Sequence, residues 1–584
     1  MNKKLVFVLW LTALLFCKTV TAQLSKDYVE APDPHPDEKA DWQAVSKGVQ
    51  SSFANPLIKF AKGAIPILKP RQSWSATGWK GERIFTQVIL WSAAASDKVS
   101  FKFTDFMATK KNLLPASIAR AQFVRHVLTD EFGGGCNTRK PEDFSVSLVA
   151  DVIDNTNDIA IPAHTTRPVW VSVNIPATAT AGTYQGSLQM FVKNKLYKNF
   201  KISIEVLENV LPKPADWQFY LDLWQNPYSV ARYHHVKPWS AQHWALLKPL
   251  MQLLADAGQK TITTTINNRA WGTQTEDPYE SMIVWNKKAN GTWGYDYSIF
   301  DKWVTFMMSL GIKQQINCYS LIPWGNEFYY NDAKAGKEIK VMAEPGTKEY
   351  AELITPFLLN FKTHLIQKGW DKITRLAMDE RNPEQMKSML VLLNSVEPGF
   401  AISLADDHKA YKIYPDQLKD LSVSFGSTID KEDLEYRKQH KMISTFYVCC
   451  AQSFPNIHTF SLPAEGVYIG WYAIATNLDG FLFWAYNNWV KDPLVDSRFR
   501  TWPAGDTYVI YPEARSSIRF EMLRDGIEDA EKIRILRAKF IRENNQDKLN
   551  KLNTLVGSFD KLTQPQNLDD MVQAAQNTLN ELSK

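Results

Sequence analysis

Two adjacent acidic residues, Asp379 and Glu380, follow directly after a strand-like run at positions 373–378. Neighbouring side chains on a regular strand point to opposite faces, but both can reach one cleft where the strand ends and the chain turns. Two carboxyl groups held together push their pKa values apart, so one stays protonated while the other stays charged. The pair is therefore a candidate acid/base site. The alternative is that a strand-end aspartate simply caps the next helix.

Polar and aromatic side chains recur where other predicted strands end. Amide and carboxyl groups can bind the hydroxyl groups of a sugar, and aromatic faces can stack on its ring; the chain contains 20 Trp. For any one of these residues, core packing or loop anchoring is an equally good explanation. The candidate substrate-binding residues are Tyr319, Tyr447, Trp484, Asn317, Asp222, Trp224, Gln225, Asn487 and Trp489.

The elements that would position these groups alternate between strand-like and helix-like segments. Apolar runs at 219–223, 261–266 and 313–319 alternate with helical patterns, and the series continues to 480–484. About eight strands over ~300 residues predict a (β/α)8 TIM-like barrel at 216–530, in which reactive groups lie at the C-terminal ends of the strands. The later crossovers are less regular, so an incomplete barrel is the alternative.

Short strands bounded by turn residues precede this region. The alternation of apolar and polar residues at 182–192 is typical of such strands, and they predict an antiparallel β-sandwich at 23–211. Pro212 and Pro214 mark a linker. Apolar stripes near the C-terminus predict a helical segment at 531–584. The chain is thus predicted to be an α/β multidomain protein: a sandwich, a barrel and a helical tail.

The N-terminus has the pattern of a signal peptide at 1–22. Lys3 and Lys4 precede a short apolar run, and small residues end it, so cleavage is expected after about Ala22. The run is too short to span a membrane. Cys17 leaves a lipoprotein signal open, although Phe16 stands where such signals carry a small residue. We therefore expect a secreted or periplasmic protein.

Charge and cysteine content exclude some classes of partner. The net charge of +5 includes three lysines of the signal peptide, so the mature chain carries only +2 and has no basic block that would bind nucleic acid. Neither the cysteines nor His234-His235 have the spacing of a metal site. A disulfide is compatible with export, but the sequence leaves its pairing open. The four cysteines after the signal peptide are Cys136, Cys318, Cys449 and Cys450.

Several motifs together resemble glycoside hydrolase family 123, the β-N-acetylgalactosaminidases. They are DLWQN at 222–226, ARY at 231–233, MDE at 378–380, FWAYN at 483–487 and RFEMLRDGIED at 519–529. The resemblance covers about 216–536, and a sandwich in front of the barrel also fits it. The 519–529 motif is the most specific, but related families of unknown activity share it.

The resemblance implies a retaining, exo-acting hydrolase of terminal β-linked N-acetylgalactosamine (GalNAc) that uses no cofactor. The 2-acetamido oxygen of the substrate would attack its own anomeric carbon and form an oxazolinium ion, an exception to the usual two-carboxylate scheme. Asp379 would orient the acetamido group and stabilise its developing charge, and Glu380 would act as general acid and base. The alternatives are a β-N-acetylglucosaminidase or another barrel glycosidase, and a non-catalytic surface protein whose sandwich binds sugar.

Overall fold

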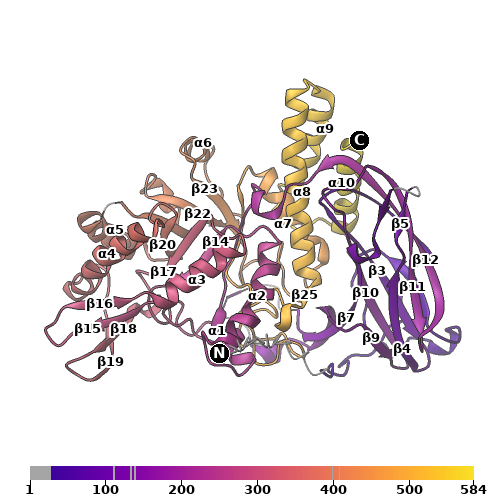
Figure 1. The fold of residues 1–584 in the computed structure, drawn as a ribbon, viewed down its shortest axis with the longest axis horizontal. Helices are drawn as coiled ribbons and strands as arrows, with labels where there is room; N and C mark the ends of the chain where they lie inside the picture. The colour runs from indigo at the N-terminus through magenta and orange to yellow at the C-terminus, as the bar shows by residue number, and fades with distance from the viewer. Residues whose placement is uncertain (1–27, 109–111, 132–134, 137–139, 398, 407) are drawn as a thin grey trace, which may run out of the picture.

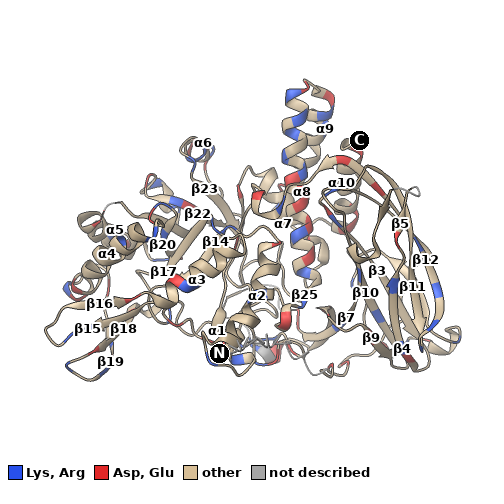
Figure 2. Ribbon diagram, in the orientation of Figure 1, with Lys and Arg blue, Asp and Glu red and all other residues tan. Residues whose placement is uncertain are grey.

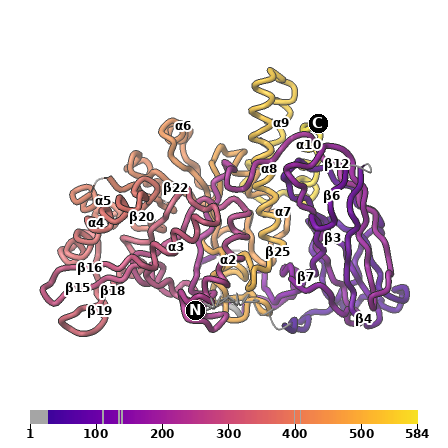
Figure 3. Tube along the Cα trace, viewed as in Figure 1, coloured from indigo at the N-terminus to yellow at the C-terminus, as the bar shows by residue number. Residues whose placement is uncertain are grey.

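The computed structural model describes residues 28–584 except 109–111, 132–134, 137–139, 398 and 407. The predicted signal peptide and Cys17 lie outside the described residues. A β-sandwich and a parallel barrel stand on either side of a group of helices from the C-terminal part of the chain (Figures 1 and 3). The predicted fold class is confirmed.

The sandwich consists of two sheets that enclose an apolar core of strand residues such as Val88, Val171 and Leu188. Its pairing is antiparallel as predicted, except that β2 lies parallel to β12. The first sheet has the order β1(Gln50–Ala54), β3(Arg83–Ser92), β10(Thr165–Asn174), β7(Ala119–Thr129), β8(Ser147–Ile153) and β25(Ser516–Ser517). The second has the order β2(Ser73–Lys80), β12(Lys195–Val210), β11(Gly182–Val192), β4(Ser96–Phe103) and β9(Asp158–Ile161), with β5(Phe106–Met107) and β6(Leu113–Leu114) beside β11.

Eight parallel strands form the predicted barrel. β13 and β14 are the two ends of the strand order. A single bridge between Leu221 of β13 and Gln259, just before β14, closes the sheet into a barrel. That order is β13(Tyr220–Leu223), β24(Gly480–Phe483), β23(Ile443–Tyr447), β22(Leu418–Ser424), β21(Ala401–Asp406), β20(Thr374–Asp379), β17(Gln315–Tyr319) and β14(Thr261–Thr265).

Helices connect most of the barrel strands, and capping side chains define where several of them begin. Ser240, Thr347 and Asn382 each accept a hydrogen bond from a backbone N–H in the first turn of the helix that follows. A single 3-10 turn joins β21 to β22 in place of a helix, which explains the irregular spacing there. The helices are α1(Pro227–Tyr233), α2(Ala241–Ala255), α3(Ser298–Ser309), α4(Lys348–Lys368), α5(Pro383–Val396), α6(Lys431–Gln439) and α7(Pro463–Ala475).

An unpredicted four-stranded sheet projects from the barrel beyond β14 and β17 (Figure 1). Its strands are short, partly exposed and lie within the long connections after β14 and β17. Their mixed polar and apolar sequence predicted no regular element there. Their order is β16(Trp293–Asp296), β15(Val284–Lys287), β18(Glu327–Asp332) and β19(Lys337–Met342).

The C-terminal helices α8(Ile518–Arg542), α9(Gln546–Gly557) and α10(Leu568–Leu582) stand between the barrel and the sandwich (Figure 1). Glycines let α7 and α8 approach closely, since a Cβ on Gly470 would lie 2.2 Å from the carbonyl oxygen of Gly526. Positive and negative side chains are interspersed along α8 and α9 (Figure 2). None of the helices in the described part of the chain is long and apolar enough to cross a membrane.

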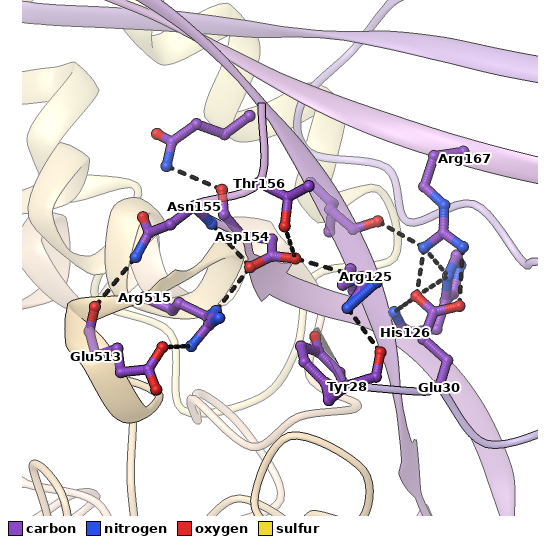
Figure 4. A network of polar contacts seen from close by, with 12 residues as sticks. Tyr28, Glu30, Arg125, His126, Asp154, Asn155, Thr156, Arg167, Glu513 and Arg515 are labelled. Atoms are coloured by element: carbon purple, nitrogen blue, oxygen red, sulfur yellow. Dashed lines mark hydrogen bonds and ion pairs between the residues drawn. The ribbon is translucent and has the colours of Figure 1, made fainter. Parts of the chain in front are cut away.

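Polar contacts also join the sandwich to the loop in front of α8 (Figure 4). Arg515 forms an ion pair of 2.6 Å with Asp154, which also lies 3.3 Å from Arg125. Asn155 donates to the carbonyl oxygen of Glu513. Because Asp154 and both arginines are buried or nearly so, removing one of these side chains would leave the charge of its partner buried and uncompensated.

The motif at 519–529 extends this junction. Arg519 pairs with Asp151 of the sandwich at 2.9 Å and also donates to the carbonyl oxygen of Ile457 in the barrel region. Glu521 pairs with Arg83 of the sandwich at 3.0 Å. The most specific motif of the sequence therefore holds α8 to both of its neighbours. Its spacing is explained by packing and charge at this junction.

Candidate active site

Asp379 is the last residue of β20, and Glu380 directly follows it. Glu380 has a φ of 45°, and its backbone N–H donates to the carbonyl oxygen of Ala405 on the next strand. This left-handed conformation is unusual for a residue with a side chain and turns the chain sharply. The turn is what lets two sequence neighbours share one end of the barrel, as the sequence analysis required.

The electrostatic environment separates the two carboxyl groups. Burial raises the pKa of Asp379 to about 7, and the negative charge of Glu380 adds to the shift. Arg381 and the indole N–H groups of Trp324 and Trp271 act in the opposite direction. At neutral pH, Asp379 therefore exchanges readily between its protonated and ionised forms.

Glu380 is held by a tyrosine from across the barrel. The hydroxyl of Tyr447, at the end of β23, donates a hydrogen bond to Glu380 Oε1. Burial is the largest cause of the strongly raised pKa of Tyr447, and the negative charge of Glu380 adds to it, so the phenol keeps its proton and remains a donor. Tyr447 thus fixes one oxygen of Glu380.

Aromatic rings surround the pair. The Tyr319 ring centroid lies 4.7 Å from that of Trp224 and 4.6 Å from that of Trp271. Tyr279 packs on the other side of Trp271 at 4.5 Å. Together with Tyr447 they belong to a buried cluster separate from the main core. Such a cluster provides flat apolar faces against which the C–H groups of a sugar ring can pack.

Unused hydrogen-bond donors lie in the same cluster. Among the described residues, none accepts a hydrogen bond from the buried indole N–H groups of Trp224, Trp324 and Trp484. The Trp324 indole lies close enough to Asp379 to lower its pKa without forming a full hydrogen bond. Buried donors without acceptors are costly, so this arrangement suits a site that receives a polar ligand.

Arg381 and three of the surrounding aromatic residues were absent from the predicted set. The Arg381 guanidinium lies 4.3 Å from the Trp324 ring, and its Nε donates to the carbonyl oxygen of Asp379 at 2.6 Å. Its position directly after the acidic pair was a usable signal. Trp271, Tyr279 and Trp324 lie in long connections after β14 and β17, where strand-end reasoning gives no position.

Comparisons with known proteins assign two regions of the chain to the same family. A model described as the glycoside hydrolase 123 catalytic domain matches residues 224–536, and one described as the glycoside hydrolase 123 N-terminal domain matches 53–192. The chain belongs to glycoside hydrolase family 123. The predicted resemblance is therefore confirmed, and the molecule is a glycosidase of this family.

A solved structure agrees with the assignment over nearly the whole hydrolase. It is a family 123 glycoside hydrolase from Clostridium perfringens, studied for glycolipid glycan hydrolysis, with 26% identity and a TM-score of 0.82 over 91% of this chain and 98% of its own. A family 39 glycoside hydrolase from Bacteroides cellulosilyticus WH2 aligns with 79% of this chain and 82% of its own, at 9% identity and a TM-score of 0.34. No curated protein matches the chain.

Within the hydrolase, four of the nine predicted binding residues lie around Asp379 and Glu380. Tyr319, Tyr447 and Trp224 belong to the buried cluster, and the partly buried Trp484 packs against it. These side chains come from β17, β23 and the residues directly after β13 and β24, on opposite sides of the barrel opening. The barrel therefore brings together residues that are up to 260 positions apart (Trp224 to Trp484).

The other five have partners inside the protein. Asn317 donates to Asp222 at 3.1 Å in the barrel interior, where both are almost fully buried. Gln225 Oε1 accepts from the backbone N–H of Thr263 at 2.9 Å. Asn487 exchanges two hydrogen bonds with the backbone of Asn226, and the Trp489 indole donates to Ile510. The structure thus places these side chains in the barrel interior and in loop anchors.

The cysteines form an interdomain link. Cys136 of the sandwich is bonded to Cys450, which follows β23 by three residues. Among the described residues, the one group of ligand-type side chains close enough to share a metal ion is Cys136, Cys449 and Cys450. Two of those three sulfurs are in the disulfide, so the group does not fit a metal site.

Proposed function

We propose that this family 123 hydrolase is a retaining exo-β-N-acetylgalactosaminidase that uses the 2-acetamido group of its substrate as the nucleophile. The observation that carries the proposal is the pair of neighbouring carboxyl groups at the end of β20, surrounded by aromatic rings and unused N–H donors. A single strand end supplies both acids, so no carboxylate from another strand is needed as the attacking group.

In the first step, the acetamido oxygen attacks C1 while the glycosidic C–O bond breaks. Glu380 donates its proton to the departing oxygen, and the substrate becomes an oxazolinium ion whose positive charge is shared with the amide nitrogen. Asp379 accepts a hydrogen bond from that N–H, and its ionised form stabilises the charge. With a pKa of about 7, much of Asp379 is already ionised at neutral pH and can take this role.

In the second step, Glu380 removes a proton from a water molecule that attacks C1. The bond from C1 to the acetamido oxygen breaks, the amide is restored, and the sugar leaves with its original β configuration. Tyr447 holds Glu380 in place for both proton transfers. Its hydroxyl is therefore engaged with the acid in the free enzyme, which leaves the acetamido carbonyl to other donors of the cluster.

The proposal is tested with aryl β-glycosides of GalNAc, N-acetylglucosamine and galactose, with the product anomer followed by proton NMR. We expect turnover of the GalNAc substrate and initial release of the β anomer. Faster turnover of the glucosaminide would make the enzyme a β-N-acetylglucosaminidase, and turnover of the galactoside would remove the acetamido mechanism. Binding without any turnover would favour a sugar-binding surface protein.

We further propose that the enzyme is exported, to the periplasm or the medium. The Cys136–Cys450 disulfide supports this, because such bonds persist mainly in oxidising compartments. Fractionation of expressing cells, with N-terminal sequencing of the mature chain, tests the proposal. A chain that is found in the cytoplasm with its first 22 residues intact would contradict it.

A further inference from the structure

A second cavity, of about 820 Å³, lies between the sandwich and the C-terminal helices. Its walls come from β2, β3 and their neighbours on one side and from α8 and α10 on the other. None of the aromatic residues around Asp379 lines it. Its volume falls within the roughly 300–1,000 Å³ typical of small-molecule sites. The cavity is therefore large enough for a ligand and separate from the catalytic cleft.

Amide side chains form the wall that α10 contributes. The helix is amphipathic: Val572, Ala575 and Leu579 are buried. The opposite stripe lines the cavity with residues spaced three and four apart, which places them on one face. These residues are Gln573, Gln576, Asn577 and Asn580. Gln576 already donates to Asp525 and Asp529, and Asn580 accepts from Lys532, so Gln573 and Asn577 are the amides best placed to donate to and accept from the hydroxyl groups of a sugar.

The sandwich supplies hydroxyl groups and an aromatic ring. Ser73, Ser75 and Thr77 alternate along β2, which is the edge strand of its sheet, and all three line the cavity. Trp74, between the two serines, is only partly buried and also lines it. An edge strand leaves backbone groups unpaired on its outer side, so this wall offers further donors and acceptors.

Several of the charged side chains on these walls are paired with one another. Lys532 lies 2.8 Å from Glu82 and 3.6 Å from Asp529, and Arg83 pairs with Glu521 at 3.0 Å. The Arg83 Nε is buried and has no hydrogen-bond acceptor among the described residues. Asp525, which also lines the cavity, accepts from Gln576, and burial beside Asp529 raises its pKa, which favours its neutral form. The cavity thus offers mainly neutral hydrogen-bonding groups and one spare donor.

We propose that this cavity is a second glycan-binding site, which holds a neutral oligosaccharide outside the catalytic cleft. Amides and hydroxyls on facing walls match the many hydroxyl groups of such a ligand. Paired wall charges fit an uncharged ligand better than a phosphate or a metal ion. The proposal does not depend on which sugar the barrel hydrolyses.

Equilibrium dialysis of the labelled disaccharide GalNAcβ1–3Gal against the full-length Glu380→Gln variant tests the proposal by counting bound molecules per chain. Asn577→Trp fills the cavity from α10, and Ser75→Tyr fills it from the sandwich. When either substitution is combined with Glu380→Gln, we expect one bound disaccharide fewer per chain at saturation than in Glu380→Gln alone. The matched control is Ala574→Trp, an exposed position on α10 that does not line the cavity.

In the otherwise wild-type enzyme, Asn577→Trp should leave turnover of the aryl GalNAc substrate within about twofold, which separates this proposal from that of the catalytic function. Unchanged melting temperatures confirm that the variants fold. The same number of bound molecules in the Glu380→Gln chain and in both cavity-filling variants would overturn the proposal. An equal loss in the Ala574→Trp control would do so as well.

Discussion

The interior of the barrel contains buried carboxyl groups and its C-terminal opening contains partly buried ones, yet the two regions use them differently. Burial raises the pKa of Asp222 in the interior and of Asp379 at the opening, each to about 7. Asp222 accepts hydrogen bonds from Thr261 and Asn317. Asp379, by contrast, receives none from the described residues that meets hydrogen-bond geometry.

A second carboxyl group of the interior follows the same rule. Asp420 accepts from Gln315 at 2.5 Å and from Ser403 at 3.0 Å, and burial raises its pKa. A perturbed pKa therefore does not by itself distinguish a catalytic acid from a structural one in this barrel. The difference lies in their partners: Asp222 and Asp420 each accept from two neighbouring side chains, whereas the Trp324 indole near Asp379 forms no full hydrogen bond with a described residue.

The largest effect that this comparison predicts is that of Glu380→Gln. The substitution keeps the shape of the side chain but removes the proton donor, so kcat on an aryl GalNAc substrate should fall by ~10²–10⁴-fold. The matched change in the interior is Asp420→Asn, which should lower the melting temperature and leave turnover per folded molecule near the wild-type value. Comparable kcat losses in the two variants would erase the distinction between the regions.

Asp379→Asn should cost ~10²–10³-fold in kcat, because it removes the charge opposite the developing oxazolinium ion. Its pH profile is the sharper test. If catalysis needs ionised Asp379, kcat/KM of the wild-type enzyme falls as the pH drops below about 7. The acidic limb should disappear in Asp379→Asn, and its persistence at the same pH would assign it to another group.

Much of this contrast could be predicted from the sequence, but not all of it. The eight barrel strands and the position of Asp379 follow from apolar runs whose ends are marked by polar residues, a local pattern. Gln225 and Asn487 follow the same pattern at strand ends. A buried amide needs partners wherever it lies, so its residue type cannot tell a ligand contact from a loop anchor. Only the three-dimensional arrangement shows that the side-chain amide of Asn487 forms both of these hydrogen bonds with the backbone of Asn226.

Several aromatic residues around Asp379 could not be predicted from the ends of the strands. Trp271 and Trp324 lie in the long connections after β14 and β17, which have no periodicity that fixes their direction. Their approach to Asp379 depends on tertiary packing, including the hydrogen bond from the Trp324 backbone N–H to Ala270. The projecting sheet of β15, β16, β18 and β19 was not predicted for the same reason.

Tyr447→Phe should have an intermediate effect. It removes the hydrogen bond to Glu380 without changing the ring, and a bond to a charged group contributes roughly 1.5–3 kcal/mol, so kcat should fall by ~10- to 150-fold. Tyr486→Phe is the matched control, because its hydroxyl donates to Leu250 away from the site. The control should lose stability but not turnover. Equal kcat values for Tyr447→Phe and the wild type would show that this hydrogen bond does not support catalysis.

The smallest expected effect concerns the interior and is one of stability. Because Asp222 has a folded-state pKa of about 7, above the ordinary value near 3.9, the folded protein binds its proton more tightly than the unfolded chain. This contribution to stability is fully present below about pH 4 and is lost as the pH rises through 7. Asp222→Asn mimics the protonated form.

The melting temperature of Asp222→Asn should therefore fall less between pH 5 and pH 8 than that of the wild type, by a few degrees, with little difference at pH 5. Scanning calorimetry of both proteins across that range measures the change. An identical pH dependence would mean that Asp222 stays ionised in the folded state, stabilised by Thr261 and Asn317. In that case the interior would hold a charge as readily as the opening, and the side-chain donors that Asp222 and Asp420 have and Asp379 lacks would alone separate the two regions.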